Sequence, residues 1–266
     1  MTGAAADLDL ISAAALEAGR IALDYRARGL DVRSKPGGSP VTDGDLAVDA
    51  FLIDALMAAR PDYGWLSEET PDTPDRLGHK RVFIVDPIDG TSAYMGDKPW
   101  FAIAIAVVED GRPLAGVVHA PALDEHYTAA VGGGARRNGE LIHASATRVL
   151  EDATMAGDAK LFASPRWGEP WPAMRIAQRN ALAYRMAVVA AGEFDAAVSM
   201  GWKNDWDVAA GDLIAREAGA LCTDPQGHRL VFNSPRARNP GLVCAAAALH
   251  PLILARTAPI DLPVDA

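Results

Sequence analysis

The sequence predicts an α+β fold in which sheets are layered with helices. Two turn signals indicate antiparallel hairpins in the first half of the chain, because Asp110-Gly111 separates two apolar runs and Asn138-Gly139 follows later. The second half instead alternates helical and strand-like segments. No glycine-rich dinucleotide fingerprint follows a predicted strand. This mixture favours a mixed-sheet sandwich over a doubly wound parallel sheet.

The first part of the chain predicts two helices. Residues 1–27 have the pattern of an amphipathic helix, with acidic side chains but neither a basic leader nor an unbroken apolar core, so we expect no signal peptide or membrane anchor there. Thr42 and Asp45 have the spacing of a capping box, with Asp in place of the usual Glu or Gln. A second helix should therefore run from this point to about Ala59, because Pro61 prevents its simple continuation.

Strands dominate the next section. The apolar run 82–85 predicts a buried strand that ends at Asp86. The runs 101–108 and 114–119 flank the Asp-Gly turn and predict a hairpin.

In the last section the pattern predicts helices over 181–191 and 208–218, with Asp207 as the N-cap of the second. Strand-like segments are expected at 195–200, 230–232 and 242–246.

Length and composition predict one large core shared by two closely packed halves. The chain has 266 residues, of which 50% are hydrophobic, which is enough for a large buried core. We expect an N-terminal α+β half, residues 1–150, that carries most of the candidate ligands. A C-terminal α/β half, residues 151–266, would complete the site.

The charge of the chain restricts its partners. A formal net charge of -10 without a block of basic residues disfavours nucleic-acid polymers and anionic membrane surfaces, so a small molecule is the expected partner. The two cysteines, Cys222 and Cys244, lie in apolar segments and indicate neither a disulfide framework nor a cysteine zinc site. Reduced cysteines fit a cytoplasmic protein.

The most informative stretch is Asp-Pro-Ile-Asp-Gly-Thr at residues 86–91. Two carboxylates, a turn and a hydroxyl leave the end of a buried strand together. Carboxylate oxygens suit a hard cation such as Mg²⁺, and the amides of Gly90 and Thr91, where a helix is expected to begin, suit a phosphate. Glu68 and Asp207 lie in loops that can return to the same edge. Taken alone, an acidic surface loop is the commoner explanation of Glu68, and a helix cap is the simple explanation of Asp207.

Five ordered motifs resemble those of the inositol monophosphatase superfamily. Residues 67–69, 86–91 and 206–211 are similar to its three signatures. Residues 41–45 resemble its upstream VTxxD element, and residues 132–139 resemble its GxGAxxNG hairpin. The resemblance spans most of the chain. It implies a layered αβαβα sandwich and a lithium-sensitive, Mg²⁺-dependent phosphomonoesterase.

By motif position, the resemblance implies a site for two or three Mg²⁺ ions. Glu68, Asp86 and the Ile88 carbonyl would hold one ion. Asp86, Asp89 and Asp207 would hold a second, and Glu68 would share a third through water. The physical logic is that a metal lowers the pKa of bound water and a second metal stabilises the leaving oxygen, so no covalent phosphoenzyme is needed.

The resemblance also implies the catalytic and substrate contacts. Thr91, supported by Asp45, would help Glu68 to deprotonate the attacking water. The amides of Gly90 and Thr91 would hold phosphate oxygens, and the metal-binding Asp89 and Asp207 would also face the substrate.

The substrate itself is predicted from weaker signals. Residues 66–69, 114–121 and 239–241 resemble the bacterial CysQ branch of 3'(2'),5'-bisphosphate nucleotidases, whereas Met200 and Gly201 stand where inositol phosphatases usually carry a Glu. We therefore expect hydrolysis of the 3'-phosphate of adenosine 3',5'-bisphosphate.

Several alternatives stay open at this point. Lys203 would contact the second phosphate, although an exposed edge lysine is the commoner explanation. Residues 179–182 depart from the Gly-Ser or Gly-Thr element that both branches carry, which leaves inositol phosphate, histidinol phosphate and fructose bisphosphate as other substrates. A catalytically silent metal-binding or regulatory module is the non-enzyme alternative. The resemblance also makes a homodimer plausible.

Overall fold

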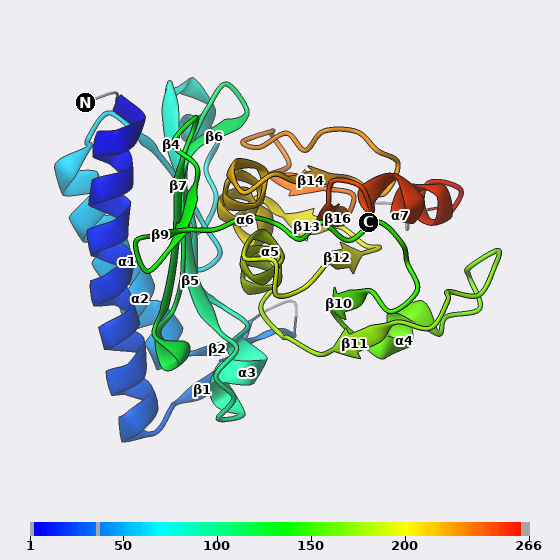
Figure 1. Cartoon of the computed structure of the whole chain (residues 1–266). Coiled ribbons are helices and arrows are strands. Elements are labelled where there is room, and N and C mark those ends of the chain that lie inside the picture. Colours follow the sequence, from blue (N-terminus) through cyan, green and yellow to red (C-terminus); the bar gives the residue numbers. More distant parts are fainter. Residues whose placement is uncertain (1–2, 36–37, 262–266) are drawn as a thin grey trace.

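The computed structural model describes residues 3–35 and 38–261, and these form five layers (Figure 1). Two N-terminal helices cover one face of a large sheet. Two central helices lie between that sheet and a second, smaller one, and two short helices lie on the outer side of the smaller sheet. The order of layers is αβαβα, as the sequence predicts.

The outer helical layer consists of α1 (Gly3–Arg28) and α2 (Asp43–Ala59). Both bonds of the predicted capping box are present at Thr42, so the start of α2 is confirmed. Apolar residues of both helices, such as Ile11 and Leu52, are fully buried in one cluster with Phe83 and other residues of the large sheet. This packing fixes α2 close to the strands that carry the acidic motif.

The large sheet is seven-stranded in the described part of the chain, and only its first pair of strands, β3 and β4, is parallel. In spatial order the strands are β3 (Gly64–Ser67), β4 (Arg81–Asp89), β5 (Ala102–Glu109), β6 (Arg112–Ala120), β7 (Glu125–Ala130), β8 (Ala135–Arg137) and β9 (Glu140–Leu141). The connecting elements are η1 (Pro74–Gly78), α3 (Thr91–Met95), η2 (Pro121–Leu123) and a ribbon of β1 (Val32–Ser34) and β2 (Pro40–Thr42).

Both predicted hairpin turns are present. Asp110 and Gly111 have φ values of 51° and 72°, and Asn138 and Gly139 have 50° and 86°. Positive φ at both central residues matches the right-handed twist of the flanking strands, which explains the Asp-Gly and Asn-Gly sequences.

The second sheet has five strands in the described residues, with mixed parallel and antiparallel pairing. In spatial order they are β11 (Arg175–Ala177), β10 (Thr154–Ala156), β12 (Ala196–Ser199), β16 (Leu242–Ala246) and β14 (Ala220–Thr223). The helices beside it are α4 (Ala159–Phe162), α5 (Leu182–Ala190), α6 (Asp205–Glu217) and α7 (His250–Thr257), and a separate ribbon pairs β13 (Lys203–Asn204) with β15 (Arg238–Asn239).

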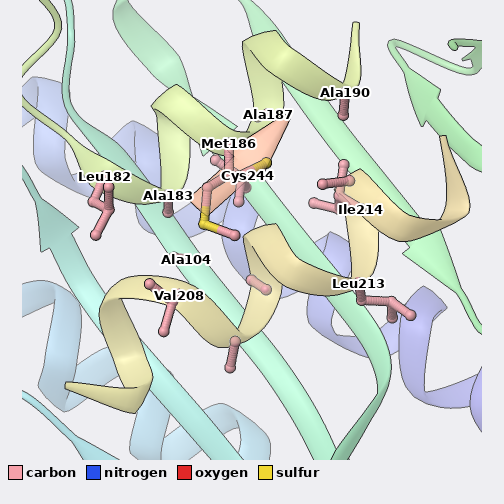
Figure 2. Packing of buried hydrophobic residues seen from close by; sticks show 14 of the residues in the cluster. Ala104, Leu182, Ala183, Met186, Ala187, Ala190, Val208, Leu213, Ile214 and Cys244 are labelled. Carbon is pink, nitrogen blue, oxygen red and sulfur yellow. The ribbon is translucent and has the colours of Figure 1, made fainter. Parts of the chain in front are cut away.

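The central helices α5 and α6 pack directly on each other (Figure 2). A Cβ atom added at Gly211 of α6 would lie 2.8 Å from the Met186 Cβ and Sδ atoms of α5. A Cβ added at Gly116 of β6 would likewise lie 3.1 Å from the Ala210 carbonyl oxygen. These glycines therefore let α6 approach both α5 and the large sheet closely.

The prediction of a strand at 230–232 is wrong. The backbone groups of residues 230–232 bond to side chains and to the turn at Gly111, and not to a neighbouring strand. The Asn239 Oδ1 atom accepts from the Val231 N–H group at 3.2 Å, and Arg112 donates to the Leu230 carbonyl at 2.7 Å. The Phe232 N–H group donates to the Gly111 carbonyl. Leu230 and Phe232 are buried and Val231 between them is exposed, and this alternation explains the strand-like pattern.

The cysteines and the helices agree with the composition. Cys222 of β14 lies opposite Cys244 of β16, and both are buried and free. Among residues 3–35 and 38–261, no helix has the length and apolar character that a membrane span requires.

Candidate metal centre

Three carboxylates from separate elements meet where the large sheet faces the layer of α5 and α6. Glu68 follows β3, Asp86 lies on β4, and Asp207 lies in the first turn of α6. One oxygen atom of each lies within 4.8 Å of the others. The structure thus brings together three of the predicted ligands.

An irregularity in β4 places Asp86 and Asp89 on one face of the sheet. Asp86 pairs with Ala104 and Asp89 pairs with Ala102, so β4 has one residue more than β5 between these pairs. Ala102 and Ala104 are two residues apart and belong to the core cluster that contains α5 and α6. The extra residue therefore turns both carboxylates toward the central helices, which a regular strand with this odd spacing would not do.

Asp89 nevertheless lies outside the group of three. Its Oδ2 atom accepts a hydrogen bond from the Ala183 N–H group of α5 at 2.6 Å. Burial and the Asp207 charge raise the pKa of Asp89 to about 8. Asp89 thus lies close enough to feel the Asp207 charge and is bonded to α5, and its role as a metal ligand stays a prediction.

Burial and mutual repulsion dominate the electrostatics of the group. Burial, followed by the Glu68 and Asp89 charges, raises the pKa of Asp86 well above its ordinary value. Burial and the Glu68 charge raise the pKa of Asp207 to about 6. A set of buried carboxylates that repel one another is a typical binding site for a hard cation, because a bound cation offsets the repulsion.

The prediction that Asp207 is the N-cap of this helix is wrong. Asn204 is the N-cap of α6, and Asp207 is the third residue of the helix, where its Oδ2 atom accepts from the Asn204 N–H group at 3.0 Å. The helix begins three residues earlier than expected because Asn204 and Asp207 form a capping box. This bond holds the Asp207 side chain at the start of the helix.

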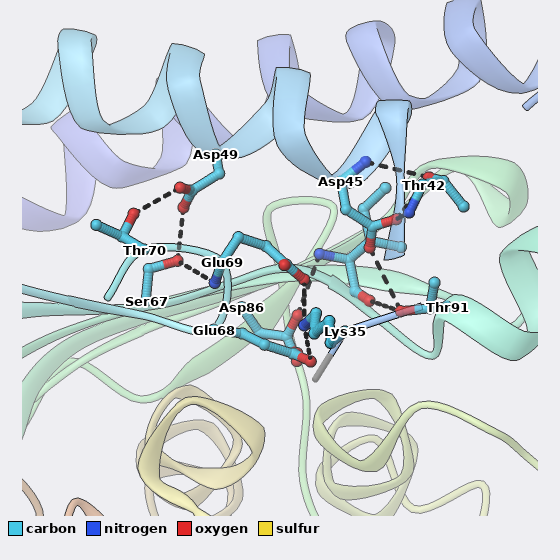
Figure 3. Close-up of polar contacts among 11 residues, drawn as sticks. Lys35, Thr42, Asp45, Asp49, Ser67, Glu68, Glu69, Thr70, Asp86 and Thr91 are labelled. Atoms are coloured by element: carbon cyan, nitrogen blue, oxygen red, sulfur yellow. Dashed lines mark hydrogen bonds and ion pairs between the residues drawn. The ribbon is translucent and has the colours of Figure 1, made fainter. Parts of the chain in front are cut away.

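Thr91 and Asp45 are in contact, as predicted (Figure 3). The Thr91 hydroxyl lies 3.3 Å from Asp45 Oδ1 and 3.3 Å from the Ile88 carbonyl oxygen. Asp45 also accepts from the Thr42 N–H and hydroxyl groups. Burial raises the pKa of Asp45, and the bonds from Thr42 oppose this. Gly90, with φ of 91°, lets the chain turn sharply from β4 into α3 just before Thr91.

Lys35 is a site residue that the sequence did not indicate. Its ammonium group lies 2.8 Å from a Glu68 oxygen and 2.7 Å from a Glu69 oxygen (Figure 3). Burial opposes its charge, but the bonds to both glutamates raise the pKa of Lys35. Burial raises the pKa of Glu69 to about 7, although Lys35 opposes the shift. The only sequence signal was a lysine in a loop rich in glycine and proline.

A second unforeseen residue, Asp49 of α2, fixes the loop that carries Glu68. Its two carboxylate oxygens accept from the Ser67 hydroxyl at 2.5 Å and the Thr70 hydroxyl at 2.6 Å (Figure 3). These donors lie on either side of Glu68 and Glu69, so α2 holds the loop at two points.

A polar pocket of about 240 Å³ adjoins the carboxylates. Lys203 lines it, and the contact with substrate that was expected of this lysine stays a prediction. Arg185, a lone charged residue in an apolar helix, was missed; its Nε atom donates to the Arg179 carbonyl at 2.6 Å. Burial lowers the pKa of Arg185 while Asp89 opposes the shift, and an arginine stays charged at neutral pH. The full lining is Asp89, Asn180, Leu182, Arg185, Ser199, Lys203 and Asp207.

Residues 179–182, which depart from the family pattern, contribute to this pocket through Asn180 and Leu182. The Asn180 Oδ1 atom is buried and accepts no hydrogen bond from the described residues. An unpartnered acceptor is costly unless a ligand donates to it. Arg179 packs over the Trp100 ring, with its guanidinium 4.7 Å from the ring centre.

Comparison with known proteins places this site in a family. The model of the inositol monophosphatase family matches residues 6–260. An inositol-1-monophosphatase from Rhizobium meliloti is 34% identical over 233 residues, which cover 83% of this chain and 86% of that protein. The 3'(2'),5'-bisphosphate nucleotidase CysQ from Escherichia coli O157:H7 is 33% identical over 226 residues, covering 81% of this chain and 89% of that protein.

A solved structure agrees with the sequence relatives. The inositol monophosphatase of Thermotoga maritima superposes with a TM-score of 0.81 and 29% identity, covering 94% of this chain and 95% of that one. The nearly equal identity to an inositol phosphatase and to a nucleotidase means that the choice of substrate rests on the pocket.

Proposed function

The chain belongs to the inositol monophosphatase family of phosphatases, and from this we propose a Mg²⁺-dependent phosphomonoesterase that prefers a substrate with a second anionic group. The proposed reaction is hydrolysis of the 3'-phosphate of adenosine 3',5'-bisphosphate. The proposed metal dependence is supported mainly by one observation. One carboxylate oxygen each of Glu68, Asp86 and Asp207 lies within 4.8 Å of the others.

These donors fit Mg²⁺. All three are carboxylate oxygens, which this hard cation prefers, and Asp86 is fully buried where its charge needs compensation. We assign Glu68, Asp86 and the Ile88 carbonyl to one ion. A second ion would use Asp86, Asp89 and Asp207, and a third would use Glu68 through water.

The chain's own residues would direct the attacking water. Bound Mg²⁺ would lower the pKa of a coordinated water and offset charge on the leaving oxygen. Thr91 donates its hydroxyl hydrogen to Asp45 or to the Ile88 carbonyl, so its oxygen can accept a hydrogen bond from that water. Glu68 would take the proton. The amides of Gly90 and Thr91, at the start of α3, would hold phosphate oxygens.

Two cations in the pocket support a substrate with a second negative group. Arg185 and Lys203 line the same space as Asp89 and Asp207, and the charges of Arg185 and Lys203 act on Asp89 and Asp207 respectively. A phosphate next to the carboxylates would be bound through metal cations, and a second phosphate would meet Arg185 and Lys203 directly. The unpartnered Asn180 oxygen would accept from a sugar hydroxyl or a base amino group. A neutral inositol ring offers the two cations hydroxyl oxygens but no anion, and hydrogen bonds between charged partners are the stronger ones.

The test is phosphate release from four esters, with and without Mg²⁺ and Li⁺. The substrates are adenosine 3',5'-bisphosphate, inositol 1-phosphate, histidinol phosphate and fructose 1,6-bisphosphate. We expect Mg²⁺-dependent release with preference for the nucleotide, inhibition by Li⁺, and loss of activity in Asp89→Asn. In Arg185→Met the nucleotide should lose at least tenfold in kcat/KM, whereas inositol 1-phosphate should change little.

Other outcomes are equally decisive. Preference for inositol 1-phosphate or histidinol phosphate would retain the metal chemistry and reject the nucleotide. Mg²⁺ binding without turnover of any ester would favour the silent regulatory module. A homodimer and a cytoplasmic location stay predictions that sedimentation and cell fractionation can check.

A further inference from the structure

The candidate metal centre is divided between two parts of the chain that repel each other. Glu68 belongs to the loop between β3 and η1, whereas Asp207 belongs to α6, more than a hundred residues later. One carboxylate oxygen of Glu68 lies within 4.8 Å of one of Asp207, and two like charges at this distance repel each other when no cation lies between them. Some other contact must hold the two segments together.

Arg76 makes one such contact, in addition to the packing of α6 on the large sheet. It lies on η1, and its side chain is 1% exposed. On its own side of the molecule the guanidinium donates to both Asp72 oxygens, at 2.6 and 2.9 Å. Across the molecule, Nη1 donates to Asn233 Oδ1 at 2.6 Å and Nη2 donates to the Ser234 carbonyl at 3.1 Å. One buried side chain therefore joins the Glu68 loop to a segment about 157 residues away.

The Asn233 segment is in turn fastened to the start of α6. The Asn233 N–H group donates to Asp205 Oδ2 at 2.7 Å. Asp205 is the first residue of α6 and is fully buried; its other oxygen accepts from the Asn239 side chain at 3.0 Å. Asp207 follows two residues later. A short, fully bonded path thus runs from Arg76 through Asn233 and Asp205 to the turn that carries Asp207.

The opposite end of the Glu68 loop is held independently. Asp49 fixes Ser67 and Thr70 to α2, while Arg76 fixes Asp72. Glu68 therefore lies in a short segment held on both sides. Of these two attachments, the one at Arg76 also bonds to the segment that is fastened to α6.

We propose that Arg76 is a positioning residue that sets the separation of the Glu68 and Asp207 carboxylates and thereby the affinity for the divalent cation. This inference rests on the proposed function, because it takes these carboxylates as metal ligands. The planar guanidinium is suited to the task, since it bonds to both segments at once in a fixed geometry. A lysine would keep the charge but could not form these several bonds in the same fixed plane.

The sharpest variant is Asn233→Gly. Asn233 has a φ of 59°, which glycine adopts freely, and glycine keeps the N–H group that donates to Asp205. The substitution therefore removes the side-chain amide, whose oxygen accepts from Arg76, and keeps the backbone bond. Arg76→Lys is the second variant.

Arg81→Lys is the matched control. Arg81 also joins distant segments, with bonds to Glu109 at 2.7 Å and to Asp7 at 2.8 Å, but it lies at the opposite end of β4 from Asp86. Its loss should lower stability without moving the metal ligands.

The experiment measures Mn²⁺ binding to the metal-free protein by electron paramagnetic resonance, together with the thermal unfolding temperature. We expect at least fivefold weaker Mn²⁺ binding in Arg76→Lys and at least twofold weaker binding in Asn233→Gly. Arg81→Lys should bind Mn²⁺ as the unchanged protein does, even where its unfolding temperature falls as far.

Unchanged Mn²⁺ affinity in folded Asn233→Gly would overturn the proposal, as would equal weakening in Arg81→Lys. Failure of the unchanged protein to bind Mn²⁺ would overturn it as well. If the unchanged protein binds Mn²⁺ but hydrolyses no ester, the proposed function fails while the positioning role of Arg76 is still decided by the variants.

Discussion

At the scale of single residues, the site depends on groups that hold the ligands as much as on the ligands. Asp49 accepts hydrogen bonds from Ser67 and Thr70, which flank Glu68 and Glu69. The loop carrying Glu68 has no regular secondary structure of its own, so these two bonds fix its path. Their removal should affect metal binding before it affects the fold.

Thr70→Val tests this directly. The substitution keeps the shape of the side chain but removes the hydroxyl that donates to Asp49 at 2.6 Å, at a cost of about 1 kcal/mol in the free energy of unfolding. We expect the Mg²⁺ concentration for half-maximal phosphate release to rise about threefold, because a loss of about 0.7 kcal/mol corresponds to that ratio. Thr70→Ser retains the hydroxyl and should behave as the unchanged protein. Equal Mg²⁺ dependence in both variants would count against the argument.

The sequence predicted the residues that belong to motifs and missed those that support them. Glu68, Asp86 and Asp207 are together as expected, because motif positions carry the chemistry. Lys35, Asp49 and Arg185 were not foreseen. Lys35 and Asp49 bond to residues 18 to 34 positions away, and Arg185 acts through a pocket formed by several elements, so no local pattern records these contacts.

At the scale of elements, the approach of α6 to α5 sets where Asp207 lies. Gly211→Ala should be destabilising although alanine favours helices by about 1 kcal/mol, because an added Cβ would lie 2.8 Å from Met186 and overpacking costs about 1–3 kcal/mol. We expect a lower urea midpoint and weaker Mg²⁺ activation, since the whole of α6 must shift. Gly201→Ala, where no atom lies within 4 Å of the added Cβ, is the control and should change neither quantity.

The contact of α1 with the large sheet predicts a dependence on pH. Ser12 of α1 bonds to His126 of β7 at 2.7 Å, and burial together with His119 lowers the pKa of His126 to about 4. The neutral ring is therefore favoured in the folded state. Its stabilising effect is complete above the unfolded pKa near 6.5 and is lost as the pH falls through 4.

His126→Gln removes this titration. As the pH falls from 7 to 4, the unchanged protein should lose about 2 kcal/mol of unfolding free energy relative to the variant. Urea unfolding of both proteins at several pH values measures the gap. A gap that stays constant would show that His126 does not titrate in this range.

Element boundaries illustrate what local sequence determines. The start of α2 and both hairpin turns were predictable, because capping residues and Asp-Gly or Asn-Gly pairs act within a few positions. The start of α6 was predicted too late because Asp207 was taken as the cap and Asn204 was overlooked. The strand expected at 230–232 failed for a different reason: Asn239 and Arg112 satisfy its backbone from outside, which its own apolar pattern does not reveal.

At the scale of the whole molecule, the fold brings buried acidic groups together where its two sheets face each other across α5 and α6. The layered architecture follows from hairpins and helix–strand alternation that the sequence shows. The meeting of Glu68 with Asp207 depends on how the layers pack, which the motifs alone do not specify. The resulting concentration of buried charge should cost stability in the metal-free protein and make the bound cation a structural component.

The variant Asp86→Asn separates the cost of the buried charge in the metal-free protein from the stabilisation by a bound cation. Asp86 is 1% exposed, and its Oδ1 atom accepts from the Ile88 N–H group at 3.1 Å, a bond that the asparagine oxygen can retain. The variant keeps the shape and removes a carboxyl whose pKa burial and Glu68 raise well above its ordinary value. Without metal, we therefore expect Asp86→Asn to unfold at a higher temperature than the unchanged protein.

The sign of the pH dependence follows from the same shift. A carboxyl with a raised folded pKa contributes stability below its unfolded pKa near 3.8 and loses that contribution as the pH rises. The advantage of Asp86→Asn in metal-free buffer should therefore grow between pH 5 and pH 8. Mg²⁺ at 100 times its Kd should stabilise the unchanged protein by about 2.7 kcal/mol and leave the variant almost unaffected. Calorimetry with EDTA and with Mg²⁺ measures both, and a metal-free variant less stable than the unchanged protein at pH 8 would refute the idea that this buried charge is held at a cost to the fold.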